Sequence, residues 1–249
     1  MSLYAIFFVL GLVVGSFLNV VVLRLNTGRS IVRGRSQCFS CGKTLAWHEL
    51  MPLVSFVAQY GRCRSCSARI SWQYPAVELI TGILFILVAW RFEYAYTGLL
   101  IVLPLALVSI LVAITVYDLR HKIIPDALVY PFIVLTLIFH YAFFGGIHIL
   151  SPDFLAGPAL FGFFALLWLV SGGKWMGFGD AKLVLGLGWL LGAQASVSAM
   201  LLAFWSGAIV GLVLLYFKRQ SLTMKSEIPF APFLILGSLV ALFFNLSFF

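Results

Sequence analysis

Long apolar runs recur along the whole chain, separated by short polar segments. Apolar residues dominate eight stretches, at residues 3–23, 74–90, 99–117, 127–144, 157–171, 181–193, 196–217 and 229–247. A membrane-spanning helix needs about 20 mostly apolar residues. The pattern therefore predicts an all-α polytopic membrane protein with about eight transmembrane helices. Because 181–217 is too long for one tilted helix, we divide it between Gly192 and Ser196; the alternative is a seven-span arrangement.

Composition and segment lengths support this interpretation. Of the residues, 63% are hydrophobic and 10% are charged, against about 45–50% and about 25% in soluble domains. The run 3–23 is long enough to span and lacks a small-residue cleavage motif, which predicts a retained first helix. The only sizeable polar segment is 24–73. We therefore expect a first transmembrane helix at 1–23, a small cytoplasmic domain at 24–73 and a transmembrane core at 74–249.

The distribution of basic residues predicts the orientation. If the N-terminus is outside, the cytoplasmic segments are 24–73, 118–126, 172–182 and 218–228, and all 16 lysines and arginines except Arg91 lie in them. This asymmetry follows the positive-inside rule. The net charge of +8 is thus mainly a topology signal. Membrane lipid is an expected partner, whereas no nucleic-acid role is expected.

All four cysteines lie in the polar segment, in two CxxC pairs formed by Cys38 with Cys41 and by Cys63 with Cys66. This spacing is typical of a zinc site in which four thiolates surround the ion. A four-cysteine shell leaves no open position for water, so the predicted zinc is structural. The alternative is two disulfides, which are rare in the reducing cytosol.

Two aspartates border apolar runs on the predicted cytoplasmic side. Asp118 ends the run 99–117, and Asp180 closes the sequence Gly177-Phe-Gly-Asp180. Two close carboxylates in a low-dielectric site share a proton, so one can activate water while the other polarises a peptide carbonyl. Gly177 and Gly179 are expected to take left-handed conformations that let the backbone pass close to an extended substrate.

Other interpretations of these acids remain open. Asp180 is also a candidate N-cap, and for Asp126, which follows Pro125, we favour the cap. From the residues alone, the pair suits a proton-coupled transporter with a carboxylate relay as well as a peptidase. A non-catalytic scaffold that recruits a partner through the cysteine domain is a third alternative.

Several motifs in a fixed order resemble one family, the prepilin peptidases within the GxGD class of intramembrane aspartyl peptidases. They are Gly15-Ser-Phe-Leu-Asn, Arg35-Ser36 before the first CxxC, Met51-Pro-Leu-Val-Ser55, Gly61-Arg-Cys63, Tyr74-Pro-Ala-Val-Glu78, Asp118-Leu with Ile124-Pro-Asp126, Gly177-Phe-Gly-Asp180 with Ala-Lys182, and Ile228-Pro-Phe-Ala-Pro-Phe233. The resemblance covers nearly the whole chain.

The resemblance implies an enzyme of the bacterial cytoplasmic (inner) membrane, with Asp118 and Asp180 as its catalytic pair and Asp126 outside the chemistry. The family cuts type IV prepilins or pseudopilins after a glycine that ends a short basic leader. It then methylates the new N-terminus with S-adenosylmethionine. The zinc domain and active site are expected to face the cytoplasm.

Methyl transfer is implied by the cysteine domain, which archaeal relatives that only cleave generally lack. Gly61 and Glu78 match family positions near it and are the candidates for cofactor binding. Alternatively, Gly61 only makes a turn and Glu78 only pairs with a basic neighbour, and the enzyme cleaves without methylating. One departure from the family is Ala231, where glycine is common; we expect it to touch no catalytic group.

Overall fold

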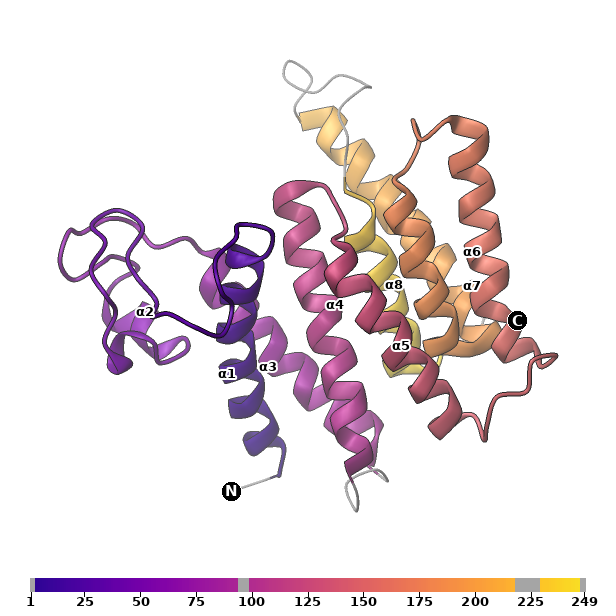
Figure 1. Ribbon diagram of the computed structural model, residues 1–249, viewed down its shortest axis with the longest axis horizontal. Coiled ribbons are helices and arrows are strands. Elements are labelled where there is room, and N and C mark those ends of the chain that lie inside the picture. The colour runs from indigo at the N-terminus through magenta and orange to yellow at the C-terminus, as the bar shows by residue number, and fades with distance from the viewer. Residues whose placement is uncertain (1–2, 94–98, 218–228, 247–249) are drawn as a thin grey trace. The chain divides into compact units, whose positions relative to one another are not determined.

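The structure is a computed structural model that describes residues 3–93, 99–217 and 229–246. In these ranges the α-helices follow one another as α1 (Leu3–Arg24), α2 (Val54–Ala58), α3 (Gln73–Arg91), α4 (Val102–His121), α5 (Asp126–Phe143), α6 (Pro152–Ser171), α7 (Phe178–Phe217) and α8 (Ala231–Phe244) (Figure 1). The chain divides into two compact units, Met1–Ala113 and Ile114–Phe249. The predicted cytoplasmic segment 218–228 lies outside the described residues.

Six helices are long and apolar enough to cross a membrane, namely α1, α3, α4, α5, α6 and α7 over Phe178–Leu214. The seventh, α8, is a shorter apolar helix of 14 residues. The predicted all-α, multi-pass membrane fold is therefore confirmed for the described part of the chain. α6 begins before the predicted residue 157, because the Ser151 hydroxyl accepts a hydrogen bond from the Phe154 N–H (3.2 Å) and caps the helix.

α7 consists of two helices joined at Gly192, where φ is 73° and ψ is −178°. Three contacts fix its path along α6: Phe178 with Trp168, Gly192 with Asp153, and Phe204 with Phe164. The partner on α6 moves from the end of that helix to its start and then back to its middle, so the second half of α7 runs opposite to the first. The break predicted between Gly192 and Ser196 is thus found at Gly192.

In the first unit, α1 and α3 are in close backbone contact. A Cβ atom at Gly11 would lie 2.7 Å from the Cα of Gly82, and one at Gly15 would lie 2.8 Å from the Cα of Glu78. Small residues four positions apart allow membrane helices to approach in this way. The two glycines therefore set the register between α1 and α3.

In the second unit, α5, α6 and α8 each pack against α7. Gly186 leaves room for the ring of Phe132 on α5, since a Cβ atom there would lie 2.6 Å from that ring. Gly188 approaches Gly157 on α6, where an added Cβ would lie 2.5 Å from the Gly157 Cα. These approaches hold the first half of α7, which carries Asp180, firmly against its neighbours.

Candidate active site and metal centre

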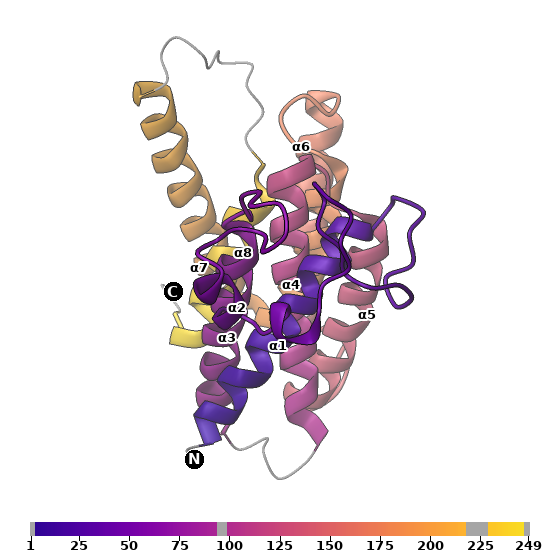
Figure 2. The same cartoon turned by 90° about the vertical axis from the view of Figure 1, so that its left-hand side faces the viewer.

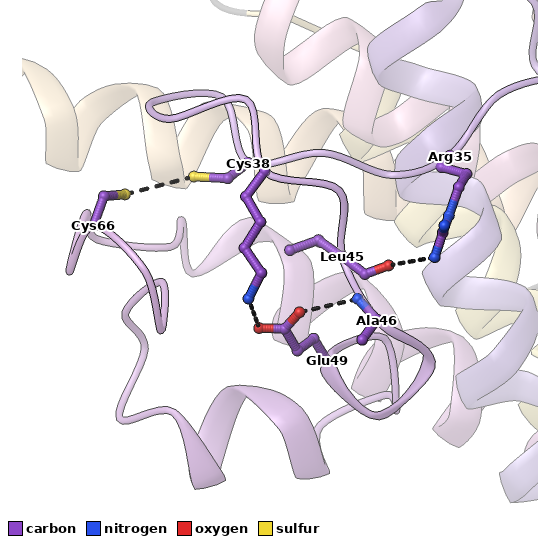
Figure 3. Close-up of polar contacts among 7 residues, drawn as sticks. Arg35, Cys38, Leu45, Ala46, Glu49 and Cys66 are labelled. Atoms are coloured by element: carbon purple, nitrogen blue, oxygen red, sulfur yellow. Dashed lines mark hydrogen bonds and ion pairs between the residues drawn. The ribbon is translucent and has the colours of Figure 1, made fainter.

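The four cysteines converge on one point in the segment between α1 and α3. All four Sγ atoms lie within 4.8 Å of one another, and the Sγ atoms of Cys38 and Cys66 are 3.8 Å apart (Figure 3). A tetrahedral zinc ion with Zn–S bonds of about 2.3 Å requires S···S edges of about 3.8 Å. All four thiols are free, not joined in disulfides. The donor set therefore fits a zinc ion.

Two short turns with the same geometry supply the sulfurs. The Cys38 N–H donates to the Lys43 carbonyl and the Cys63 N–H donates to the Ala68 carbonyl, each at 2.9 Å. Four residues after the first cysteine of each pair, the backbone is left-handed, with φ 71° at Gly42 and φ 56° at Ser67. The repeated turn was not predicted from the sequence, because the two segments share little beyond their cysteines.

Backbone amides favour the thiolate form of the first cysteine in each turn. N–H groups of Cys41 and Ser40 point at the Cys38 sulfur and lower the pKa of this thiol to about 6. Cys66 and Ser65 do the same for Cys63, whose pKa is also lowered. Because the thiolate is the metal-binding form, the turns prepare these sulfurs for zinc before it binds.

Polar contacts brace the first turn. The Glu49 carboxylate accepts hydrogen bonds from the Ala46 N–H (2.9 Å) and from Lys43 Nζ (3.1 Å), and these two donors lower the pKa of Glu49 (Figure 3). The Arg35 guanidinium donates to the Leu45 carbonyl at 3.4 Å. The loop around Cys38 and Cys41 is therefore held by charged side chains that are not themselves metal ligands.

Asp118 and Asp180 come together in the second unit. Asp118 lies in the last turn of α4, Asp180 lies in the first turn of α7, and their side chains are buried, at 4% and 7% exposure. The Asp118 carboxylate is close enough for its charge to act on Asp180. One Asp118 oxygen is reached by the backbone N–H of Ala231 at the start of α8, and its Oδ2 is buried without a partner among the described residues.

The glycines of the Asp180 motif act differently from the expectation. Neither Gly177 nor Gly179 has positive φ, so the predicted left-handed backbone is wrong. The Gly177 N–H instead donates to the Asp180 carboxylate, as in one half of a capping box. Gly179 is required by packing, because a Cβ atom there would lie 2.9 Å from the Cβ of Ile124. The two aspartate motifs therefore meet at this glycine.

Asp126 is not the helix cap that we favoured. Pro125 occupies the N-cap position of α5, where no side chain caps the helix, and Asp126 is the first helical residue. Its carboxylate forms an ion pair with Lys182. The Lys182 ammonium also lies over the rings of Tyr130 and Phe178, 5.4 and 5.8 Å from their centroids. This lysine, absent from the predicted site, joins the segment after Asp118 to the segment that carries Asp180.

Ala231 also differs from the expectation, since its backbone N–H reaches Asp118. Because the contact uses only the main chain, any residue with a backbone N–H can supply it, and the alanine that departs from the family pattern keeps it. No side-chain pattern in the sequence marks such a contact. Ala231 is fully buried, so the group that it presents to Asp118 is held away from bulk water.

The two candidates for cofactor binding lie in the first unit. Gly61 has φ 65° and its N–H donates to the Phe56 carbonyl (2.9 Å) just before the second cysteine turn. Glu78 is 7% exposed, accepts a hydrogen bond from the Leu53 N–H (2.8 Å) and is also hydrogen-bonded to the Ser16 hydroxyl. Both residues therefore have structural partners in the described part of the chain.

These features define a class of protein. It is a multi-helix membrane protein that combines a buried aspartate pair with a cluster of four cysteines suited to a metal ion. Residues 9–92 match the bacterial peptidase A24 N-terminal domain, and residues 105–212 match the type IV leader peptidase family. The chain belongs to the type IV leader peptidase family.

Three relatives support this membership, each named a prepilin leader peptidase/N-methyltransferase. The one from Pseudomonas putida is 36% identical over 94% of this chain and 88% of its own length. The Bacillus subtilis relative is 32% identical over 95% of this chain and 92% of its own length. The Myxococcus xanthus relative is 40% identical over 86% of this chain, which spans 64% of that relative. No solved structure matches the chain significantly.

Proposed function

We propose that this chain removes the leader from type IV prepilins or pseudopilins by aspartyl hydrolysis, with Asp118 and Asp180 as the catalytic pair. The supporting observation is that both are buried at the ends of two different helices, where the charge of Asp118 acts on Asp180. Family membership and the names of the relatives support the reaction class. No observation favours the alternative of an ion- or proton-coupled transporter.

The proposed reaction needs no metal. The ionised carboxylate takes a proton from water as the water oxygen bonds to the scissile carbonyl carbon, while the protonated carboxylate donates to the carbonyl oxygen. As this intermediate collapses and the C–N bond breaks, the aspartate that took the water proton gives it to the leaving amine. The other aspartate takes a proton from the gem-diol hydroxyl as the new carboxyl group forms. The Ala231 N–H and the Gly177 N–H, which reach Asp118 and Asp180, hold the carboxylates in orientation for these transfers.

We place the enzyme in the bacterial cytoplasmic membrane, with its zinc domain (24–73) and aspartate pair facing the cytoplasm and the transmembrane core (74–249) carrying the chemistry. Every lysine and arginine except Arg91 lies in a segment assigned to that side. A prepilin whose apolar stem stays in the membrane would then present its basic leader at the same face. Membrane lipid and the prepilin are the partners of this arrangement.

We assign zinc a structural role. Four cysteine sulfurs complete a tetrahedral shell and leave no position for water, unlike catalytic zinc sites. Cys38, Cys41, Cys63 and Cys66 would hold the ion, and it would close a polar segment of about 50 residues that is too small to be stable without such a crosslink. Zinc content measured on the purified protein should be one ion per chain, and a Cys63→Ser variant should lose it.

Methyl transfer to the new N-terminus is the second proposed activity, with S-adenosylmethionine supplying an activated methyl group when bound. The support is the name shared by the relatives. For Gly61 and Glu78 we propose an indirect part, because Gly61 shapes the turn before Cys63 and the Glu78 carboxylate is already bonded to Leu53 and Ser16. A Gly61→Ala variant should then lose methylation and keep cleavage.

Intact mass of a purified prepilin after incubation with the detergent-purified enzyme tests both activities. The proposal expects loss of the leader mass, and gain of one methyl group when S-adenosylmethionine is added. A product that loses its leader and gains no methyl group would indicate a peptidase without methyltransferase activity. Several prepilins left uncut would contradict the proposed cleavage and favour the transporter or scaffold.

A further inference from the structure

The segment Leu50–Gly61, which contains α2, carries no charged residue and exposes apolar side chains, although it belongs to the polar stretch between α1 and α3. Glu49 precedes it and Arg62 follows it. Met51, Val54 and Val57 are 42%, 58% and 71% exposed. Val54 and Val57 both lie in α2 (Val54–Ala58), and three residues is close to one helical turn, so these two side chains lie along one side of the helix. Met51 precedes them in the chain. An apolar face of this kind is unfavourable in water.

Hydrogen bonds hold this segment beside the candidate spans α1 and α3, short of the end of α1 at Arg24. The Leu53 N–H donates to Glu78 on α3 (2.8 Å), and the same carboxylate is hydrogen-bonded to Ser16 on α1. Ser16 lies about two turns, or about 12 Å, before the end of α1 at Arg24. Leu53 is therefore held at a depth within the span.

The two views of the structure agree with this depth. In Figure 1 and in Figure 2, α2 lies at a height between the two ends of α1, not beyond the end at Arg24. Both helices belong to the first compact unit. The position of α2 thus matches the depth given by the Leu53 to Glu78 hydrogen bond.

The backbone of the segment is also suited to a surrounding without water. In lipid, each N–H group needs a partner within the protein. Carbonyls of the same segment accept hydrogen bonds from the N–H groups of Val54, Ser55, Val57, Gln59, Tyr60 and Gly61. Leu53, at the N-cap of α2 and with φ 58°, has its N–H accepted by Glu78. This buried carboxylate thus satisfies the donor that would otherwise be left unpaired at the start of α2.

We propose that Leu50–Gly61 is a re-entrant segment embedded in the cytoplasmic leaflet, with the exposed side chains of Met51, Val54 and Val57 covered by lipid acyl chains. Tyr60, 91% exposed at the end of the segment, reaches the interface where aromatic side chains are favoured. Arg62 and Arg64 follow directly and meet anionic head groups. The lipid occupant follows from continuity with α1 and α3, which are themselves candidate spans.

Depth-dependent fluorescence quenching tests the proposal. An environment-sensitive fluorescent amino acid is placed by codon suppression at Val57 or, as a control, at Val32, which is 88% exposed and lies outside the segment. This avoids labelling the zinc cysteines. Full-length protein is reconstituted in phosphatidylcholine/phosphatidylglycerol vesicles, with or without brominated acyl chains, and iodide is added from the aqueous side. Zinc content confirms that both variants are folded.

The expected result is loss of emission at position 57 with brominated lipid and protection there from iodide, with the opposite behaviour at position 32. Quenching of position 57 by iodide and not by brominated lipid would overturn the proposal and place the segment in the cytosol. Protection from both quenchers would also overturn it, by showing that protein covers this face. None of these outcomes depends on peptidase activity, so the proposed function is tested separately.

Discussion

Replacing Lys182 by methionine is expected to loosen the contact between the two aspartate motifs. The side chain is 17% exposed and forms an ion pair with Asp126, whose side chain is 57% exposed. An ion pair of this exposure contributes about 0.5 kcal/mol, and each of the two ring contacts of the ammonium adds about 0.5–1 kcal/mol. The total is about 1.5–2.5 kcal/mol. If it all serves to hold Asp180 in place, cleavage falls by about 10- to 70-fold, at about 1.4 kcal/mol per factor of ten.

A double-mutant cycle separates these contributions. Asp126→Asn removes the ion pair and leaves the ring contacts, so kcat/KM for prepilin cleavage should fall only about two- to threefold. In the double variant Asp126→Asn/Lys182→Met, kcat/KM should match that of Lys182→Met alone, because the partner is already lost. The inference that the Asp126–Lys182 ion pair positions Asp180 would be refuted if the two single substitutions lowered kcat/KM by factors that multiply in the double variant. It would also be refuted if Lys182→Met cleaved like wild type. Unchanged zinc content, and thermal unfolding that stays cooperative and shifts down by no more than about 10 °C, serve as the controls that each variant is folded.

Three further predictions follow from local geometry. Gly179→Ala should lose most cleavage activity, because the added Cβ would lie 2.9 Å from the Cβ of Ile124. Gly177→Ala should keep most of its activity, since the atom nearest to an added Cβ is 3.8 Å away. Equal losses of activity in the two variants would contradict this prediction. Ser67→Gly should stabilise the zinc domain by about 1 kcal/mol in chelator or denaturant titrations, and the matched Gly42→Ser should destabilise it. Zinc affinity, followed with a colorimetric indicator, should fall throughout as the pH is lowered, because the Cys66 thiol, whose pKa is raised to about 11, must lose its proton to bind the metal. The fall should become steeper below about 6, the lowered pKa of Cys38, and a slope that does not change there would refute the prediction.

The number and kind of helices could be predicted because each helix that crosses a membrane requires a long run of apolar residues. The break at Gly192 was predictable for the same reason, since the run is too long for one crossing. Helix starts were less accurate: α6 begins at Pro152, where a serine cap and a proline at the first helical position give a readable start signal. That signal is local and independent of hydropathy, so a search for apolar runs overlooks it.

The candidate metal site could be predicted in full, because its four ligands come from two short motifs with fixed spacing. The surroundings of the aspartates could not. Lys182 approaches Asp126 only because α7 packs against α5, and the sequence separation carries no sign of that contact. The Ala231 N–H is a main-chain group, which any residue except proline provides. Tertiary packing and backbone donors therefore account for what the sequence left out.

Two of the wrong expectations share one physical cause. Gly179 and Asp126 were interpreted through local backbone preferences, a left-handed turn and a helix cap. In the structure both are explained by a neighbour that is distant in sequence: Ile124 leaves no room for a side chain at Gly179, and Lys182 pairs with the Asp126 carboxylate. Local propensity is a weak guide where two motifs pack directly against each other.

Leader removal by Asp118→Asn and Asp180→Asn variants tests whether these two aspartates form the catalytic pair. The matched control is Asp153→Asn, whose carboxylate accepts a hydrogen bond from the Ala193 N–H (2.9 Å) at the break in α7 and can be replaced there by an amide oxygen. Cleavage is measured by the intact mass of a purified prepilin, with zinc content and thermal unfolding recorded for each variant. Both Asp118→Asn and Asp180→Asn should be folded and should not cleave, while Asp153→Asn should cleave. Wild-type cleavage by either of the first two variants would contradict the assignment of the catalytic pair.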